Sequence, residues 1–221
     1  MIDVKNTVRG LALDIDDTLA WTCREWVEHL HLKFGNPENL TPREFVEKYG
    51  LIQHAEYFKR EEVYAHIRTM CVNPTLHESI AVIADALPAL EKISSVIPIV
   101  AYLTARPESM RSITEPWLKR HGFPERELIM RPDELPLEDM PRWKAQALEQ
   151  LYPKAIGIID DNPSICTHLS KEYPGVIFLY NHSGDGVSHP AAQSCSDWND
   201  VVQKVINYFE SRNPTVSDNC P

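Results

Sequence analysis

Short apolar runs recur along the 221-residue chain, and each is followed by polar side chains. Continuous apolar runs of this length are typical of strands that are buried on both faces of a parallel sheet. A weaker run between the second and third adds one more candidate strand. The predicted strands cover residues 8–13, 97–103, 155–159 and 176–180, with the weaker one at 128–130.

Helical patterns separate these runs and follow the last of them. Strands that alternate with helices predict an α/β fold in which a parallel, Rossmann-like sheet carries helices on both faces. Ser196 and Asp197 supply a start signal for the last helix. The predicted helices cover residues 108–120, 142–151, 163–172 and 197–211.

Residues 20–95 break this alternation, because they show helical patterns only. No ordinary crossover between two strands is that long. The sequence therefore predicts a core made of residues 1–19 and 96–221, interrupted by an inserted helical domain at residues 20–95. The helical patterns in the insertion cover residues 24–34, 42–49 and 54–70, with a broken stretch at 77–93.

Carboxylates follow two of the predicted strands. Asp14, Asp16 and Asp17 come after the strand at 8–13, and Asp160 and Asp161 come after the strand at 155–159. Open parallel sheets bind ligands at the carboxyl ends of their strands, so these side chains are expected to converge there. Converging carboxylates need protons or a cation, and oxygen ligands suit Mg²⁺. Such a site favours phosphoryl transfer, with one carboxylate as nucleophile and a second as acid and base.

Each of these residues also has an ordinary structural interpretation. The acidic turn and Asn162 are typical of helix caps, Thr104 is suited to cap a helix, and most lysines, Lys144 included, lie in solvent. Polar residues of the right kinds at successive strand ends, in the right order, favour a functional site over four unrelated caps.

The order of these motifs resembles the haloacid dehalogenase-like (HAD) superfamily. Asp14-Ile15-Asp16-Asp17-Thr18 is similar to its first motif, D-x-D-x-T, and Leu103-Thr104-Ala105-Arg106 is similar to its second. Lys144 is the best match for the lysine of the third motif, ahead of Lys119 and Lys154. Ile158-Ile159-Asp160-Asp161 is similar to the fourth, acidic motif.

The resemblance implies roles for these positions. Asp14 is the expected nucleophile, and Asp16 is the expected general acid and then base. Thr18 would hold the loop around Asp16. Thr104 and Lys144 would bind phosphoryl oxygens.

The resemblance also implies a Mg²⁺ site made of Asp14, Asp16 through its backbone carbonyl, and Asp161, with Asp160 in support. For Arg106, two interpretations stay open, namely a bidentate phosphate contact and a residue of the protein surface.

An insertion between the first and second motifs resembles the C1 cap of this superfamily. Such a cap closes over the pocket and excludes water, which favours a small phosphorylated metabolite over a phosphoprotein. Trp21, Arg24 and His29 are placed either to overhang the pocket or to belong to the packing and surface of the cap.

The expected activity is Mg-dependent hydrolysis of a small phosphate monoester through an aspartyl phosphate, with a nucleotidase among the candidates. A phosphotransferase or another HAD hydrolase is the alternative. A phosphoacceptor module of the receiver type is disfavoured, because D-x-D-x-T is contiguous and Met130 and Arg131, not an aspartate, end the strand at 128–130. A non-catalytic binding protein is disfavoured because no motif is degraded.

Charge and composition narrow the partners. The formal net charge is −10, which disfavours a coat on nucleic acid or a role at a membrane surface. The five cysteines are widely spaced, and the first residues lack an apolar signal segment, so a cytoplasmic protein is expected. Composition fixes no oligomeric state.

Overall fold

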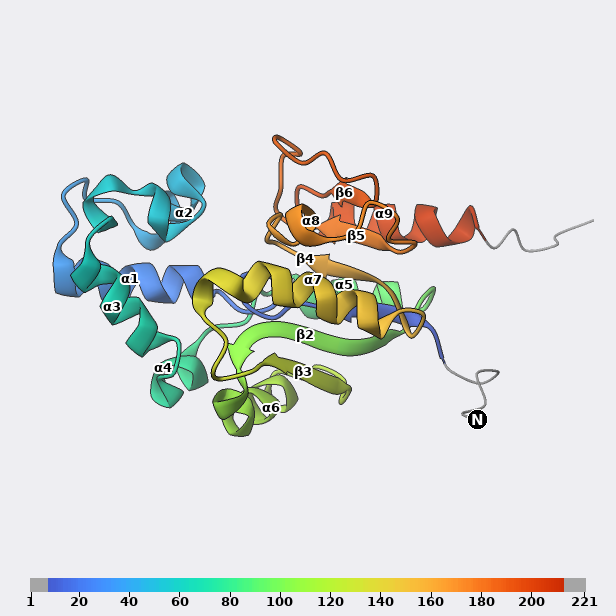
Figure 1. Cartoon of the computed structure of the whole chain (residues 1–221), viewed down its shortest axis with the longest axis horizontal. Coiled ribbons are helices and arrows are strands. Elements are labelled where there is room, and N and C mark those ends of the chain that lie inside the picture. Colours follow the sequence, from blue (N-terminus) through green and yellow to red (C-terminus); the bar gives the residue numbers. More distant parts are fainter. Residues whose placement is uncertain (1–7, 213–221) are drawn as a thin grey trace, which may run out of the picture.

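A six-stranded parallel sheet forms the centre of the molecule in the computed structural model, which describes residues 8–212 (Figure 1). The strand order is β3-β2-β1-β4-β5-β6, and every neighbouring pair is parallel. The predicted α/β class with a Rossmann-like parallel sheet is confirmed. The strands are β1 (Gly10–Leu13), β2 (Ile99–Pro107), β3 (Glu127–Arg131), β4 (Ala155–Asp160), β5 (Val176–Leu179) and β6 (Ala192–Ser194).

Helices cover both faces of this sheet. One apolar cluster joins the sheet to α5 (Ala86–Ser94), α6 (Arg111–Arg120) and α9 (Trp198–Glu210). The opposite face packs against α7 (Met140–Leu151) and α8 (Ile165–His168). Because both faces are covered, the central strands β1, β4 and β5 consist mostly of buried apolar residues. Within residues 8–212, no helix has the length and hydropathy needed to span a bilayer.

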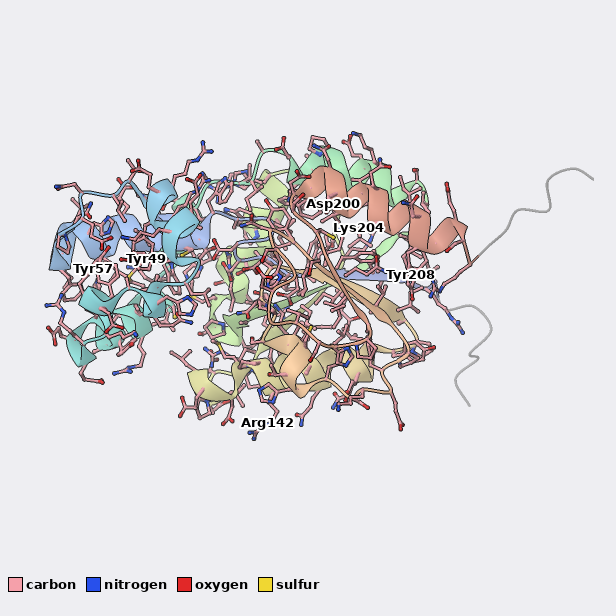
Figure 2. The ribbon with its side chains drawn as sticks, turned by 90° about the horizontal axis from the view of Figure 1, so that it is seen from above. Tyr49, Tyr57, Arg142, Asp200, Lys204 and Tyr208 are labelled. Atoms are coloured by element: carbon pink, nitrogen blue, oxygen red, sulfur yellow. The ribbon has the colours of Figure 1, made fainter. Side chains whose placement is uncertain are left out.

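The inserted segment lies at one end of the molecule, shown in blue to teal in Figure 1. Its helices surround a separate apolar cluster that runs from Cys23 to Leu76 and includes Phe45 and Phe58. Figure 2 shows Tyr49 and Tyr57 at this end, far from Asp200, Lys204 and Tyr208 along α9. The helices are α1 (Thr22–Phe34), α2 (Pro42–Tyr49), α3 (Glu61–Met70) and α4 (Pro74–Ser79), with short 3₁₀ turns at Ile52–His54 and Glu56–Phe58.

The helix α5 packs on the sheet and against α9, away from the cluster of the other inserted helices. The domain boundaries expected at residues 20 and 95 stay a prediction. The packing shows that the end of this segment contributes to the core of the sheet.

Several predicted elements differ in extent from those observed. The helix expected at 163–172 is only one turn, because the chain leaves α8 extended at Leu169. The helix expected at 54–70 begins later, at Glu61, because Arg60 has extended backbone angles. The stretch expected at 77–93 divides into α4 and α5. The strand β6 was not predicted, since its three residues are only half-buried and carry no apolar pattern.

The face covered by α7 gives a direct test of the packing. Leu148 is fully buried between α7 and the sheet, whereas Leu32 on α1 is 82% exposed. Leu148→Ala should lower the free energy of unfolding by about 2–5 kcal/mol, because it removes buried methyl groups and leaves a cavity. Leu32→Ala, the matched control, should change it by less than about 0.5 kcal/mol. Urea unfolding measures both, and equal losses would contradict this packing.

Candidate functional site

The loop after β1 brings three aspartates to the carboxyl edge of the sheet. The Asp14 N–H donates to the carbonyl of Ile159 at 2.9 Å, which fixes the end of β1 beside β4. Asp17 adopts a positive φ of 57°, a conformation that aspartate tolerates better than most residues. Its carboxylate accepts a hydrogen bond of 2.8 Å from the Cys23 N–H, at the start of α1. The turn at Asp17 therefore lets the chain double back into the inserted segment.

Lys144 joins the first and fourth motifs. Its ammonium lies 2.6 Å from Asp14 Oδ1 and 2.7 Å from Asp160 Oδ2, and all three side chains are buried. The two carboxylates raise the pKa of Lys144 above its usual value, although burial acts in the opposite direction. Of the three candidate lysines, only Lys144 reaches this edge; Lys154 pairs with Glu127, and Lys119 lies in the last turn of α6.

Thr18 connects the loop to the acidic motif. Its hydroxyl oxygen accepts a hydrogen bond from the Asp161 N–H at 3.1 Å, and it lies 3.3 Å from Asp161 Oδ1 and 3.5 Å from Asp14 Oδ2. Because Thr18 is fully buried, these bonds hold Asp161 close to Asp14.

Arg106 and Asp16 form the second ion pair of the site. The guanidinium donates from Nε and Nη2 to the Asp16 carboxylate at 2.8–3.1 Å, and the Thr22 hydroxyl donates to the same carboxylate at 2.5 Å. Arg106 is 2% exposed. Against the opposing effect of burial, the guanidinium lowers the pKa of Asp16 to about 2.

Thr104 lies within β2 and is fully buried. Its hydroxyl oxygen accepts a hydrogen bond of 3.2 Å from the Arg106 N–H, so it does not cap a helix. The register between β2 and β3 shifts between Thr104 and Pro107, the stretch that carries the guanidinium.

A cavity of about 320 Å³ opens over these residues, between the sheet and the inserted segment. Its size suits a small organic ligand. The sheet side contributes Asp14, Asp16, Arg106, Lys144 and Asp161, and the inserted segment contributes apolar and polar side chains. The latter are Thr22, Cys23, Trp26, Leu51, Ile52, Gln53, Ile67, Cys71 and His77.

The predicted site residues come together as a group. Asp14, Asp16, Thr18, Thr104, Arg106, Lys144, Asp160 and Asp161 all lie at one edge of the sheet, within contact of one another or of the cavity.

The residues proposed to overhang the pocket behave differently. Trp21, Arg24 and His29 do not line the cavity. Arg24 stacks on the Trp21 ring at 3.5 Å, and His29 lies 3.4 Å from Glu25.

The sequence did not single out Trp26, His77 and Arg131, among other lining residues, as site residues. For Arg131 a signal existed, because it ends β3 at the edge of the sheet where the other site residues gather. For Trp26 and His77 no signal existed, since only the fold of the insertion decides which of its faces looks into the cavity.

The donor set fits a hard divalent cation. Carboxylate oxygens of Asp14, Asp160 and Asp161 lie within 4.8 Å of one another. Burial and the neighbouring carboxylates raise the pKa of Asp14 and Asp161 above the usual range. Oxygen atoms that repel each other in this way are the ligands that Mg²⁺ stabilises. The Asp16 side chain is not in this cluster, because Arg106 and Thr22 hold it.

Comparison with known proteins supports the fold. No family model matches the sequence, and no curated protein matches it. Solved structures match over most of their length. A dehalogenase shares 15% identity at a TM-score of 0.54, covering 92% of this chain and 98% of its own. A HAD-superfamily hydrolase of subfamily IA from Geobacter sulfurreducens shares 11% identity at 0.51, covering 90% and 97%. YfnB of Bacillus subtilis, described as a HAD-hydrolase and solved bound to magnesium, shares 13% identity at 0.52, covering 90% and 99%.

These matches, together with the sheet order and the position of the site, show that the chain has the HAD-like fold. The resemblance that the motifs indicated is confirmed at the level of the fold.

The acidic cluster predicts how magnesium affects stability. Addition of Mg²⁺ to the wild-type protein should raise the melting temperature, because a ligand at 100 times its Kd adds about 2.7 kcal/mol. Asp161→Asn should raise the melting temperature without metal, since it relieves repulsion, and should abolish most of the response to Mg²⁺. Differential scanning calorimetry with and without Mg²⁺ measures both effects.

Asp185→Asn, in an exposed loop, is the matched control and should respond to Mg²⁺ like the wild type. A wild-type protein whose melting temperature ignores Mg²⁺ would show that the cluster holds no such ion.

Proposed function

We propose that the protein is a Mg²⁺-dependent phosphatase that hydrolyses a small phosphate monoester through an aspartyl phosphate. The observation that carries this proposal is the pair of carboxylates in one loop with opposite surroundings. Asp14 faces Lys144 and the acidic cluster, while Asp16 is turned toward Arg106 and Thr22. Two carboxylates in distinct environments are suited to two distinct roles.

Asp14 acts as the nucleophile. Its carboxylate oxygen attacks phosphorus, the phosphorus–oxygen ester bond breaks, and the phosphoryl group is transferred to Asp14. Lys144 and Thr104 hold the phosphoryl oxygens, and the ammonium neutralises part of their charge. Mg²⁺ would be held by the carboxylates of Asp14 and Asp161 and by the backbone carbonyl of Asp16. When bound, the ion would neutralise part of the charge on the phosphoryl group.

Asp16 transfers the proton. It gives a proton to the leaving oxygen and then takes one from the water that attacks phosphorus. That attack breaks the bond between phosphorus and the Asp14 carboxylate oxygen and releases inorganic phosphate. A phosphoryl group entering the cavity competes with Asp16 for the Arg106 guanidinium, since both are anionic oxygen acceptors. Movement of Arg106 onto the phosphoryl oxygens leaves Asp16 better able to carry a proton.

The matched dehalogenase raises a second chemistry on the same fold. Cleavage of a carbon–halogen bond needs no proton on the leaving halide, so it has no use for a carboxylate at the position of Asp16. Asp16 is present in the lining of the cavity, and two side-chain partners hold it there. This favours a phosphate ester as substrate.

The cavity also supports a small substrate. Side chains of the inserted segment line it on the side opposite the sheet, and its volume of about 320 Å³ suits a small ligand better than a segment of a folded phosphoprotein. Nucleotides and sugar phosphates are candidate substrates of this size. A phosphotransferase is the alternative, because an acceptor alcohol can compete with water for the aspartyl phosphate. We also propose that the protein acts in the cytoplasm, as its sequence led us to expect.

Replacement of the nucleophile tests the reaction. The wild-type protein should hydrolyse p-nitrophenyl phosphate with Mg²⁺ and lose the activity with EDTA. Asp14→Asn should lower kcat by about 10³-fold or more, because the amide does not attack phosphorus. Release of p-nitrophenol gives the rates, and Asp139→Asn on the protein surface is the control. Wild-type turnover by Asp14→Asn would refute the mechanism, and turnover of 2-haloalkanoates in its place would favour dehalogenation.

Arg106→Lys tests whether the guanidinium binds the phosphoryl oxygens or only positions Asp16. A lysine keeps the charge but loses the bidentate fork, so kcat/KM should fall about 10- to 100-fold. The inhibition constant of inorganic phosphate should rise by a similar factor if the guanidinium binds phosphoryl oxygens. An unchanged inhibition constant with a lower kcat would limit Arg106 to positioning Asp16. Arg142→Lys is the control, because Figure 2 shows Arg142 pointing away from the molecule.

A further inference from the structure

Arg131 is a buried cation of the cavity that the proposed reaction does not use. It ends β3, is 4% exposed, and lines the same cavity as Asp14 and Lys144. Figure 1 shows β3 beside β2, on the side of the sheet away from β4.

The other two buried cations of the cavity have carboxylate partners. Lys144 lies within 2.7 Å of Asp14 and Asp160, and Arg106 forms a bidentate pair with Asp16. Arg131 differs from them, because its guanidinium donates only to backbone carbonyls. Nε donates to Ala105 at 3.1 Å, and Nη1 donates to Pro132 at 3.2 Å and to Leu135 at 2.5 Å.

No carboxylate among residues 8–212 lies within 4.0 Å of the Arg131 nitrogen atoms, and Nη2 makes no hydrogen bond to another described residue. A guanidinium stays charged at any physiological pH. Removing such a charge from water costs several kcal/mol unless an anion compensates it, so an arginine buried without one is suited to bind an anionic ligand.

A second buried polar side chain, that of His77, also lines the cavity. His77 on α4 is 2% exposed, and neither of its ring nitrogens has a hydrogen-bond partner. Trp26 packs edge-on against its ring, with the ring centroids 6.4 Å apart. Both ring nitrogens are sealed against neighbouring atoms and do not open onto the cavity, so His77 forms part of its wall and no ligand contact is assigned to it.

We propose that Arg131 binds a second anionic group of the substrate, a carboxylate or a phosphate. The inference rests on the proposed function and narrows it. The substrate class becomes small phosphate monoesters that carry a second acidic group.

The position of β3 sets the length of such a substrate. In the strand order, β2 separates β3 from β1, and neighbouring strands lie about 4.8 Å apart. The ends of β3 and β1 are therefore roughly 10 Å apart, and the side chains of Arg131 and Asp14 shorten the gap between the groups that they bind. A phosphate and a second anion separated by a few bonds match this arrangement.

The second-anion proposal is tested by ligands that differ in one group. ω-Phosphonoalkanoates of increasing length carry a carboxylate, ω-phosphonoalkanols of equal length carry a neutral hydroxyl, and alkane bisphosphonates carry a second phosphorus acid. Isothermal titration calorimetry with Mg²⁺ gives Kd without requiring turnover. The wild type should bind one of the two dianionic series about 10- to 100-fold more tightly than the matched alkanol, and the series that does so names the second group.

Arg131→Met should remove this preference, weakening the dianionic ligand about 10- to 100-fold and the alkanol less than threefold. Arg126→Met is the matched control, since Arg126 also donates to backbone carbonyls beside β3 but does not line the cavity. If Arg131→Met does not fold, Arg131→Lys carries the test, with a loss of about 3- to 10-fold confined to the dianionic ligand.

Equal loss for both kinds of ligand in the Arg131 variants, or no preference in the wild type, would overturn the second-anion site. The corresponding phosphate esters separate this result from the proposed function. If the wild type binds the dianionic ligand through Arg131 but hydrolyses none of the esters, the phosphatase proposal fails and the anion site stands.

Discussion

Electrostatic repulsion among carboxylates at one edge of the sheet is the constraint on which the site depends. Asp14, Asp16 and Asp17 share the loop after β1, and Asp160 and Asp161 lie at the end of β4, the neighbouring strand in the sheet. Two buried cations make this arrangement possible. Lys144 lies 130 positions from Asp14 in the sequence, and Arg106 lies 90 positions from Asp16. The acidic edge is therefore stable only when the strands are assembled and both cations are in place.

The two cations pair with different carboxylates because they lie on different elements of the fold. Lys144 comes from a helix on one face of the sheet and reaches two carboxylates on neighbouring strands. Arg106 comes from the end of β2 and, among the described carboxylates, pairs with that of Asp16. The two aspartates of one short loop thus receive different electrostatic surroundings. The HAD-like fold is shared with a dehalogenase, so the surroundings of Asp16, and not the fold, carry the argument for phosphate chemistry.

The fold class and the position of the site could be predicted from the sequence, because both depend on short-range patterns. Apolar runs gave the buried strands, and the polar residues just after them marked the edge where ligands bind. The pairings across the site could not be predicted. Arg106 was open between a phosphate contact and a surface residue, and the structure places its guanidinium on Asp16. Such a contact depends on the paths of two strands and on buried depth, which no local pattern encodes.

The inserted segment was the least predictable part. Its helices were expected from their periodicity, but the expected helix at 54–70 was wrong in extent, and α5 turned out to pack with the sheet. Amphipathic patterns show that a helix has an apolar face and do not show which neighbour that face meets. Trp26 and His77 line the cavity, and the helical periodicity alone could not have predicted that they would.

The first turn of α1 has a mechanical consequence. The Thr22 hydroxyl is hydrogen-bonded to the Asp16 carboxylate and the Cys23 N–H to the Asp17 carboxylate, so the first helix of the inserted segment starts on the loop that carries the aspartates. A rotation of α1 about its first turn has to lengthen one of these bonds or carry an aspartate with it. The orientation of α1 and the direction of the Asp16 carboxylate are therefore coupled through these two hydrogen bonds.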